Sequence, residues 1–592
     1  MSSNQTNQAQ QETEKYFFRA SAEDFRKIPG SPIAYSASQA IRSLFTHGTL
    51  SDFANTRLGM ATADNNRFLR LWHEVKKSNT NFLAQDRNEA RISFKKWFPY
   101  QKGGEYRKWY GNNEYCVNWA NDGDEIQNFK DKKSGKIRSH NYNLEFIFRR
   151  GVTWNALTSG KTSARISERS LFDNAGSSLF VNNKVSEETI IGLINSEIML
   201  AVFPLISPTL NYQPGDLSKL PAFFPYELQV NVTNIVTKLI ELGKKDWDAC
   251  ETSWNFTTLP LLQSDRLPKV KASYQSLRIY WREMTLETQS LEEENNRIFI
   301  DAYGLQDELT PEVPLKEITL TCNPHYRYGG DKTEEELEAL LLADTMREFI
   351  SYAVGCMFGR YSLDEPGLIL ANQGETLADY LAQVPEPTFR PDEDNVIPML
   401  DGDWFADDIT ERFRRFLKVT FGEEHYEENL RFIEEVLNVK GKRNYSLRDY
   451  FLSEFYTDHL KRYKKRPIYW LFSSPKGSFN ALIYMHRYRP DTVSVVLNDY
   501  LREFRAKLLA RKNHLEALGI SASASQAEKT KALKEVEKIS KMIAEVDAYE
   551  RDTLYPLATQ QLEIDLDDGV KANYPKFGAA LKKIPGLEAK DD

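Results

Sequence analysis

The sequence is poor in cysteine and contains no long apolar run. Its four cysteines are scattered singly, without CxxC or Cys/His spacing, at Cys116, Cys250, Cys322 and Cys356. This spacing argues against a disulfide framework and a structural zinc site, so we expect reduced, buried thiols. No stretch of about 18 apolar residues occurs, and residues 1–14 are polar, so the sequence predicts neither a membrane span nor a secretory signal. A cytoplasmic protein without a membrane partner is therefore expected.

A positive net charge is also lacking, because 77 Lys and Arg stand against 85 Asp and Glu, a formal net charge of −8. Total charge does not exclude a DNA partner, since a DNA site needs only a local basic surface. One segment of the chain is strongly basic and contains only three carboxylates. Its cations are Lys130, Lys132, Lys133, Lys136, Arg138, Arg149, Arg150, Lys161, Arg165 and Arg169. The sequence thus holds a basic island in an acidic protein.

The length of 592 residues predicts at least two domains, and the composition of 41% hydrophobic and 27% charged residues fits a globular protein. Up to about residue 224, short apolar or aromatic runs alternate with Gly, Asn and Asp turns, which indicates mixed strands and helices. Helical spacing dominates the rest of the chain. The expected fold class is α+β.

Several helices are predicted individually. Apolar residues recur at three- and four-residue intervals over 228–256 and 277–303, which indicates long amphipathic helices. Residues 186–203 begin with a capping-box-like sequence, and the predicted helix is ended by Pro204 and Pro208.

The C-terminal part predicts an antiparallel helical hairpin. Residues 491–518 form its first helix with Gly519 as the C-cap, and a small-residue loop at 521–525 leads to a second helix at 527–554. One apolar stripe on the second helix supports the pairing. It consists of Leu533, Val536, Ile539, Ile543, Val546 and Tyr549.

A resemblance to a known family rests on several strings rather than on one motif. They are KYFFRA at 15–20, FRKIPGSPIAY at 25–35, GMATADNNRFLR at 59–70, PTLNYQPGD at 208–216, KDWD at 245–248, ETSW at 251–254, ISYAVGCMFGRY at 350–361 and KRPIYWLFSS at 465–474. In order and spacing they resemble the part that follows the catalytic core in PglX-type adenine-specific DNA methyltransferases of BREX phage-defence systems. The resemblance extends from about residue 15 to the end.

This resemblance implies DNA-sequence recognition and duplex clamping for adenine-N6 methylation, with double-stranded DNA and a methyltransferase core as partners. The core is absent from the chain, because neither a Gly-rich S-adenosylmethionine turn nor an Asn/Asp-Pro-Pro-Tyr/Phe loop is found. S-adenosylmethionine is therefore expected only in the complete enzyme. The nearest string, Asn323-Pro324-His325-Tyr326 after the strand-like residues 317–321, is interpreted as a structural loop. We expect the chain to be inactive alone.

The expected organisation follows the resemblance and the composition. It comprises a disordered leader (1–14), linker helices from the missing core (15–50), a target-recognition domain (51–225), a helical region (226–366), a connection (367–404), a C-terminal α/β subdomain (405–490), and the helical hairpin with its tail (491–592).

Candidate DNA contacts are cations and one aromatic residue of the predicted recognition domain. Residues 97–110 interleave cations, aromatics and glycines at a predicted strand-turn-strand, and residues 132–136 form a basic loop tip, so we expect both segments to approach phosphates. Trp97 and Trp109 fit core packing equally well. The candidates are Arg67, Lys96, Lys102, Lys108, Tyr110, Lys136, Arg138, Arg149, Arg150, Lys161 and Arg165. We expect the cations from about 95 to 169 to gather on one face.

The sequence also offers alternative candidate sites and an alternative function. Asp64, Glu74 and Lys76 follow the order of a metal-dependent nuclease, but their apolar neighbours favour a structural helix. A second basic cluster, at 461–466, is a further candidate DNA contact. The main alternative function is a scaffold that binds other BREX proteins; steep salt dependence of DNA binding separates the two.

Overall fold

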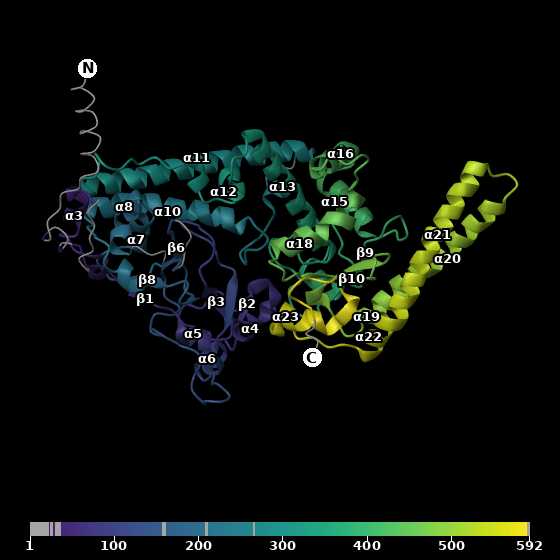
Figure 1. The fold of residues 1–592 in the computed structure, drawn as a ribbon, viewed down its shortest axis with the longest axis horizontal. Coiled ribbons are helices and arrows are strands. Elements are labelled where there is room, and N and C mark those ends of the chain that lie inside the picture. Colours follow the sequence, from purple (N-terminus) through teal and green to yellow (C-terminus); the bar gives the residue numbers. More distant parts are fainter. Residues whose placement is uncertain are drawn as a thin grey trace, which may run out of the picture. The chain divides into compact units, whose positions relative to one another are not determined.

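A computed structural model describes Glu23, Arg26, Ile28, Pro29 and residues 37–156, 161–207, 211–263 and 267–588. The predicted leader at 1–14 lies outside these residues. The chain divides into two units, each discontinuous in sequence (Figure 1). Unit 1 comprises residues 1–68, 81–247 and 281–329, and unit 2 comprises residues 69–80, 248–280 and 330–592.

Unit 1 contains two small sheets. In the first, the antiparallel strands β1 (Ala54–Arg57), β8 (Ser178–Val181), β5 (Gly151–Trp154) and β6 (Ala164–Ser167) follow each other in this order. In the second, β3 (Trp97–Gln101) pairs antiparallel with β4 (Tyr115–Asn118) and parallel with β7 (Leu171–Phe172). Every residue of β3, β5 and β6 is buried, because both faces of these strands are covered.

Helices cover the first sheet of unit 1. Helix α7 (Glu187–Ile194) packs on β5 and β6, and the apolar stripe Leu228, Val232, Val236 and Leu239 of α10 (Tyr226–Asp248) joins the same core. The remaining helices are α3 (Gln39–Leu44), α4 (Asn65–Phe68), α5 (Arg87–Ile92), α6 (Ala120–Gln127), α8 (Glu197–Ile206), α9 (Pro214–Leu217), the C-terminal half of α11 (Val270–Tyr303), and α12 (Pro324–Tyr328).

Unit 2 is mostly helical. Its helices are α13 (Glu334–Met357), α14 (Leu377–Gln383), α15 (Ile409–Phe421), α16 (Tyr426–Leu437), α17 (Leu447–Tyr450), α18 (Tyr456–Arg462), α19 (Thr492–Val495), α20 (Arg502–Ile520), α21 (Gln526–Tyr549), α22 (Tyr555–Gln560) and α23 (Val570–Asn573). A small antiparallel sheet has the order β10 (Tyr469–Ser473), β11 (Asn480–Tyr484), β9 (Ile397–Pro398). The buried last turns of α13 and the buried β10 coincide with two strings of the family resemblance.

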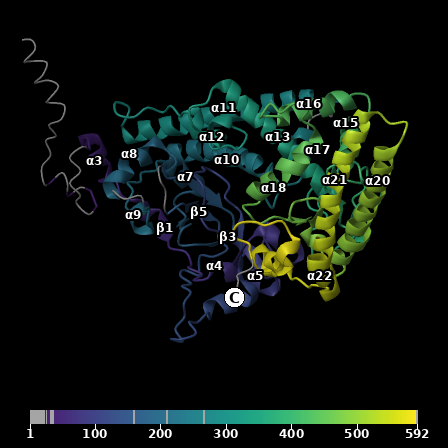
Figure 2. The same cartoon turned by 45° about the vertical axis from the view of Figure 1, so that its right-hand side comes forward.

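The predicted helical hairpin is confirmed (Figures 1 and 2). Ion pairs fix its antiparallel register, since Arg502 binds Glu550 near the base and Arg511 binds Glu535 nearer the tip. The predicted cap at Gly519 is wrong: α20 continues to Ile520, and its C-cap is Ser521.

The α+β fold class is confirmed, as are the long helices α10 and α11. Three local predictions are wrong. Residues 186–203 break into α7 and α8, bent by 74°, and α8 continues past Pro204 to Ile206 although the proline cannot donate an i→i−4 hydrogen bond. Residues 72–74 are a 3₁₀ turn after a short strand, not an amphipathic helix, and residues 317–321 are turns.

Among the described residues, no single helix is long and apolar enough to cross a membrane. Helices α7 and α8 reach that length and apolar composition only when the bent pair is taken together. Most of their apolar residues lie in the core of unit 1.

Candidate nucleic-acid interface

A basic hairpin, residues 130–138, follows α6 in unit 1. Backbone pairing between Lys130 and Ile137 closes it, and Asp131 shapes its tip, where the carboxylate accepts hydrogen bonds from the backbone N–H of Lys133 (3.1 Å) and Ser134 (2.7 Å). These bonds hold the pKa of Asp131 below its ordinary value. The turn needs Gly135, whose φ is +69°.

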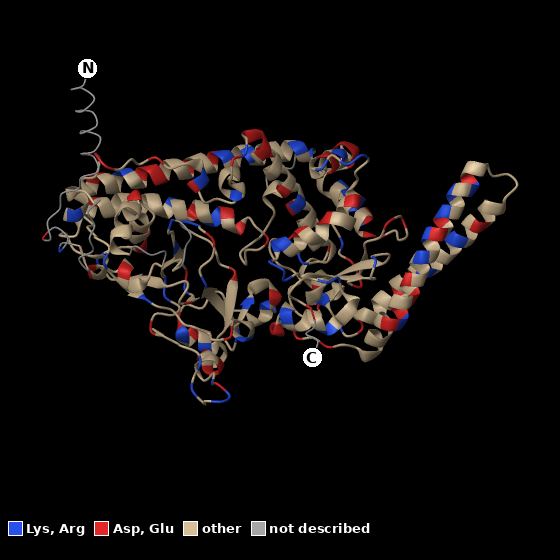
Figure 3. Cartoon of the chain, in the orientation of Figure 1, with Lys and Arg blue, Asp and Glu red and all other residues tan. Residues whose placement is uncertain are grey.

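The basic hairpin exposes its cations. Figure 3 shows them along the loop that extends beyond α6. They are Lys130, Lys132, Lys133, Lys136 and Arg138. No ion pair of these side chains is found within the described ranges, because the nearest carboxylate in sequence, Asp131, is used by the turn. The arrangement leaves five positive charges facing solvent on nine residues.

An aromatic residue joins the base of the basic hairpin to α4. The ring of Phe129 lies between two guanidinium groups, at 5.0 Å from that of Arg67 and 5.4 Å from that of Arg138. Arg67 also binds Glu125 of α6 at 2.7 Å. The structure therefore brings three predicted contacts, Arg67, Lys136 and Arg138, to one place, although Arg67 is already paired with a carboxylate.

Two further predicted DNA contacts, Arg149 and Lys96, have side chains that reach solvent. Arg149 is exposed, with its guanidinium 5.3 Å from the ring of Phe146, and Lys96 is half-buried above Trp97 at 5.1 Å. An aromatic ring neutralises no formal charge, so both cations stay available to an anion.

Three predicted cations have internal carboxylate partners. Lys102 binds Asp173 at 3.3 Å, and Lys161 binds Glu317 at 2.7 Å. Arg150 faces three glutamates within 3.4 Å, those at positions 168, 187 and 188. Hydrogen bonds and charges from these glutamates raise the pKa of Arg150 although burial opposes the charged form. These three side chains stabilise unit 1 and are weak candidates for phosphate contacts.

Three predicted contacts are corrected to core residues. Lys108 is 5% exposed and binds the equally buried Glu292 of α11, while Arg165 is fully buried and donates to the carbonyl of Arg107 (3.1 Å) and to Asn155 (2.9 Å). Tyr110 is also buried in the core. Because all three side chains are buried, they are not exposed for contact with DNA in this conformation.

The tryptophans that fitted either role are also core residues, since Trp97 is 0% and Trp109 2% exposed. The predicted single cationic face over residues 95–169 is thus not present. Free cations concentrate on the basic hairpin instead, and its turn residues, Asp131 and Gly135, were the signal for this in the sequence.

The second basic cluster, in unit 2, is only partly free. Arg462 binds the buried Glu251 at 3.2 Å, and Arg466 lies 3.8 Å from Glu74, whereas Lys461 and Lys465 are exposed. Glu74 itself is buried and accepts from the backbone N–H of Leu71 and Val570, so it serves the fold of unit 2 rather than a nuclease centre.

The string at 323–326 has a structural role. The side chain of Asn323 accepts from the backbone N–H of His325 (3.2 Å) as the cap of α12 and donates to the carbonyls of Leu315 and Ile318. With its amide fully engaged, Asn323 does not fit the role of the residue that grips a flipped adenine.

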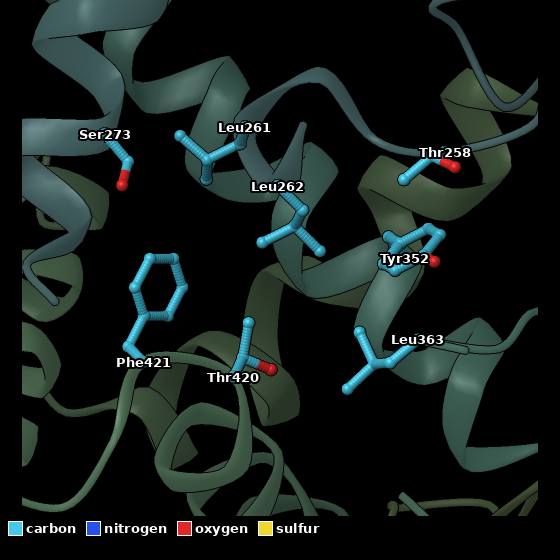
Figure 4. A pocket seen from close by; sticks show the side chains of 8 residues that line it. All are labelled: Thr258, Leu261, Leu262, Ser273, Tyr352, Leu363, Thr420 and Phe421. Atoms are coloured by element: carbon cyan, nitrogen blue, oxygen red, sulfur yellow. The ribbon is translucent and has the colours of Figure 1, made fainter. Parts of the chain in front are cut away.

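A cavity in unit 2 is no better suited to that cofactor (Figure 4). Its volume of about 80 Å³ is far below that of typical ligand sites, and two of its hydroxyls, on Tyr352 and Thr420, already donate to backbone carbonyls. Its lining consists of Thr258, Leu261, Leu262, Ser273, Tyr352, Leu363, Thr420 and Phe421.

Comparison with known proteins shows that the chain is homologous to adenine-specific methyltransferases of the PglX/BrxX type. It is 38% identical over 585 residues to the adenine-specific methyltransferase PglX of Lacticaseibacillus casei (strain Zhang), and 37% identical over 577 residues to the adenine-specific methyltransferase BrxX of Escherichia coli O9:H4 (strain HS). The alignments cover 97% and 95% of this chain but 46% of each relative, so the chain spans about half their length. No protein-family model matches. The resemblance found in the sequence is confirmed.

Proposed function

We propose that this chain is the DNA-recognition region of an adenine-specific DNA methyltransferase and that the basic hairpin is its principal contact with the phosphate backbone. The homology to adenine-specific methyltransferases supports a role in DNA methylation. The five exposed cations within residues 130–138 support a contact with phosphates. Lysine and arginine side chains displace the counterions condensed on duplex DNA, which drives binding without regard to sequence. Arg149 and Lys96 are secondary contacts in this proposal.

Catalysis and S-adenosylmethionine binding are assigned in this proposal to the part of such enzymes with which the chain does not align. Positioning the duplex against that part is the contribution of this chain, and it does not require any residue here to touch the reacting adenine. Chromosomal DNA as the partner implies action in the cytoplasm. In this proposal the recognition domain comprises residues 51–225.

The test is DNA binding by fluorescence anisotropy on a labelled duplex over a range of salt concentrations. The wild-type affinity should fall steeply as salt rises, since each neutralised phosphate contributes about 0.9 to the slope of log K against log salt. The variant Lys132→Glu with Lys133→Glu should bind more weakly, with a slope smaller by about 2.

A matched control is the variant Lys238→Glu with Lys245→Glu, which changes two exposed lysines of α10 in the same unit by the same charge. It should keep the wild-type slope. If both double variants lose affinity equally, total charge and not the basic hairpin determines binding. If the wild-type protein binds DNA without salt dependence or not at all, the recognition role is wrong and the scaffold alternative gains support.

A further inference from the structure

Phe94, directly after α5 in unit 1, combines two unfavourable features. Its side chain is 86% exposed, and its φ is +54°, a left-handed backbone that bulky residues rarely adopt. Exposure forgoes the free energy of burying an aromatic ring, and the backbone conformation adds strain. Glycine would remove both costs, so the fold alone does not explain a phenylalanine here.

The surrounding turn holds this side chain outward. The backbone N–H of Ser93 donates to the carbonyl of Glu89 and ends α5, and the side chain of Ser93 donates to the carbonyl of Ala90. Three residues after Phe94 the fully buried β3 begins at Trp97. The chain thus passes from a surface helix into a core strand within one turn, and the turn points Phe94 into solvent.

The sequence around Phe94 is basic, and the helix that precedes it packs on the helix that leads into the basic hairpin. Helix α5 lies beside α6 (Figure 1), and Arg87 of α5 binds Asp122 of α6 at 2.6 Å. Helix α6 leads into the basic hairpin. Three cations lie near Phe94 in sequence, the exposed Arg91 and the half-buried Lys95 and Lys96. An exposed aromatic ring among cations fits an anionic partner that also offers flat, apolar surfaces, which is the chemistry of stacked bases.

We propose that Phe94 is an aromatic wedge that inserts into the base stack of duplex DNA bound along the basic hairpin. This inference rests on the proposed function. Enzymes that modify a base take it out of the stack, and an inserted ring restores part of the stacking that the flipped base gives up. The ring already lies outside the fold before DNA arrives, so insertion requires no rearrangement of the core.

The experiment compares a labelled intact duplex with the same duplex carrying one abasic site, where the gap for a wedge already exists. Wild-type protein should bind the abasic duplex more tightly by about 5-fold to 100-fold, the range that stacking of a base on an aromatic side chain supports. Phe94→Ala should remove this preference and bind both duplexes alike. Phe94→Trp should retain it.

Two controls separate the wedge from other roles. Tyr226→Ala changes another aromatic side chain of unit 1, 80% exposed, and should keep the preference. Lys132→Glu with Lys133→Glu should weaken binding to both duplexes by the same factor and leave the preference intact. Thermal unfolding of Phe94→Ala should be no lower than wild type, because the removed side chain is exposed.

The outcomes distinguish the two proposals. A Phe94→Ala protein that keeps the preference for the abasic duplex, or a wild-type protein without one, overturns the wedge and leaves the basic hairpin standing. Equal weakening on both duplexes by Phe94→Ala would assign Phe94 to general binding and also overturn the wedge. Absence of all DNA binding overturns the proposed function and the wedge with it.

Discussion

Replacing Lys108 by methionine removes the cation that lies against Glu292 in the interior of unit 1. The side chains of the pair are 5% and 3% exposed, so the variant leaves a carboxylate in a nearly water-free site with Trp109 as its other hydrogen-bond donor, at 2.6 Å. Breaking a buried pair from one side costs about 3–5 kcal/mol, because the remaining charge is uncompensated. We expect the free energy of unfolding of unit 1 to fall by that amount near neutral pH.

The pH dependence of this loss tests its electrostatic cause. Burial raises the pKa of Glu292 above its ordinary value of 4.5, and the charge of Lys108 opposes that rise. Without Lys108 the pKa rises further. A carboxyl group with a raised pKa in the folded state favours folding below about pH 4.5, and this contribution is lost as the pH rises through the folded pKa. The deficit of the variant against wild type should therefore be larger at about pH 8 than at about pH 5.

Urea unfolding followed by tryptophan fluorescence measures the effect, since Trp109 touches Glu292. Adding Glu292→Gln to Lys108→Met should restore most of the stability, because the neutral amide still accepts from Trp109. The reasoning is refuted by a loss below about 1 kcal/mol at pH 8, or by a loss that is equal at both pH values.

Three more outcomes follow from the same structure. Arg149→Glu should weaken DNA binding with unfolding unchanged, whereas Arg150→Glu should lower the unfolding midpoint, because only Arg150 lies among three glutamates. Asp394→Asn should flatten the decline in stability of unit 2 between about pH 4 and pH 7, since burial, and next the charge of Asp392, raise the pKa of Asp394 to about 7; an unchanged pH profile of denaturation would contradict this. Ser525→Ala should speed hydrogen exchange in the first turn of α21 by removing its N-cap, a loss of about 1 kcal/mol.

Local sequence signals predicted much of the secondary structure. The helices α10, α11, α20 and α21 follow from apolar spacing alone, because an amphipathic helix needs only one buried face and any neighbour can cover it. The turn of the basic hairpin was predictable from Asp131 and Gly135, because both act locally. Asp131 accepts a hydrogen bond from the backbone N–H of Ser134, and Gly135 adopts the positive φ that the turn requires. Helix boundaries were less predictable, as at Gly519, which lies inside α20 instead of capping it.

The sequence by itself determined that the chain is homologous to PglX/BrxX methyltransferases, that it is α+β, and that residues 130–169 form a basic island in an acidic protein. Only the tertiary structure decided which of those cations are free. Lys108 and Lys132 are the same residue type, but Lys108 meets a glutamate 184 residues further along the chain and Lys132 meets solvent. A charge finds its partner through space, so no pattern of neighbouring residues distinguishes a buried ion pair from a side chain available to DNA.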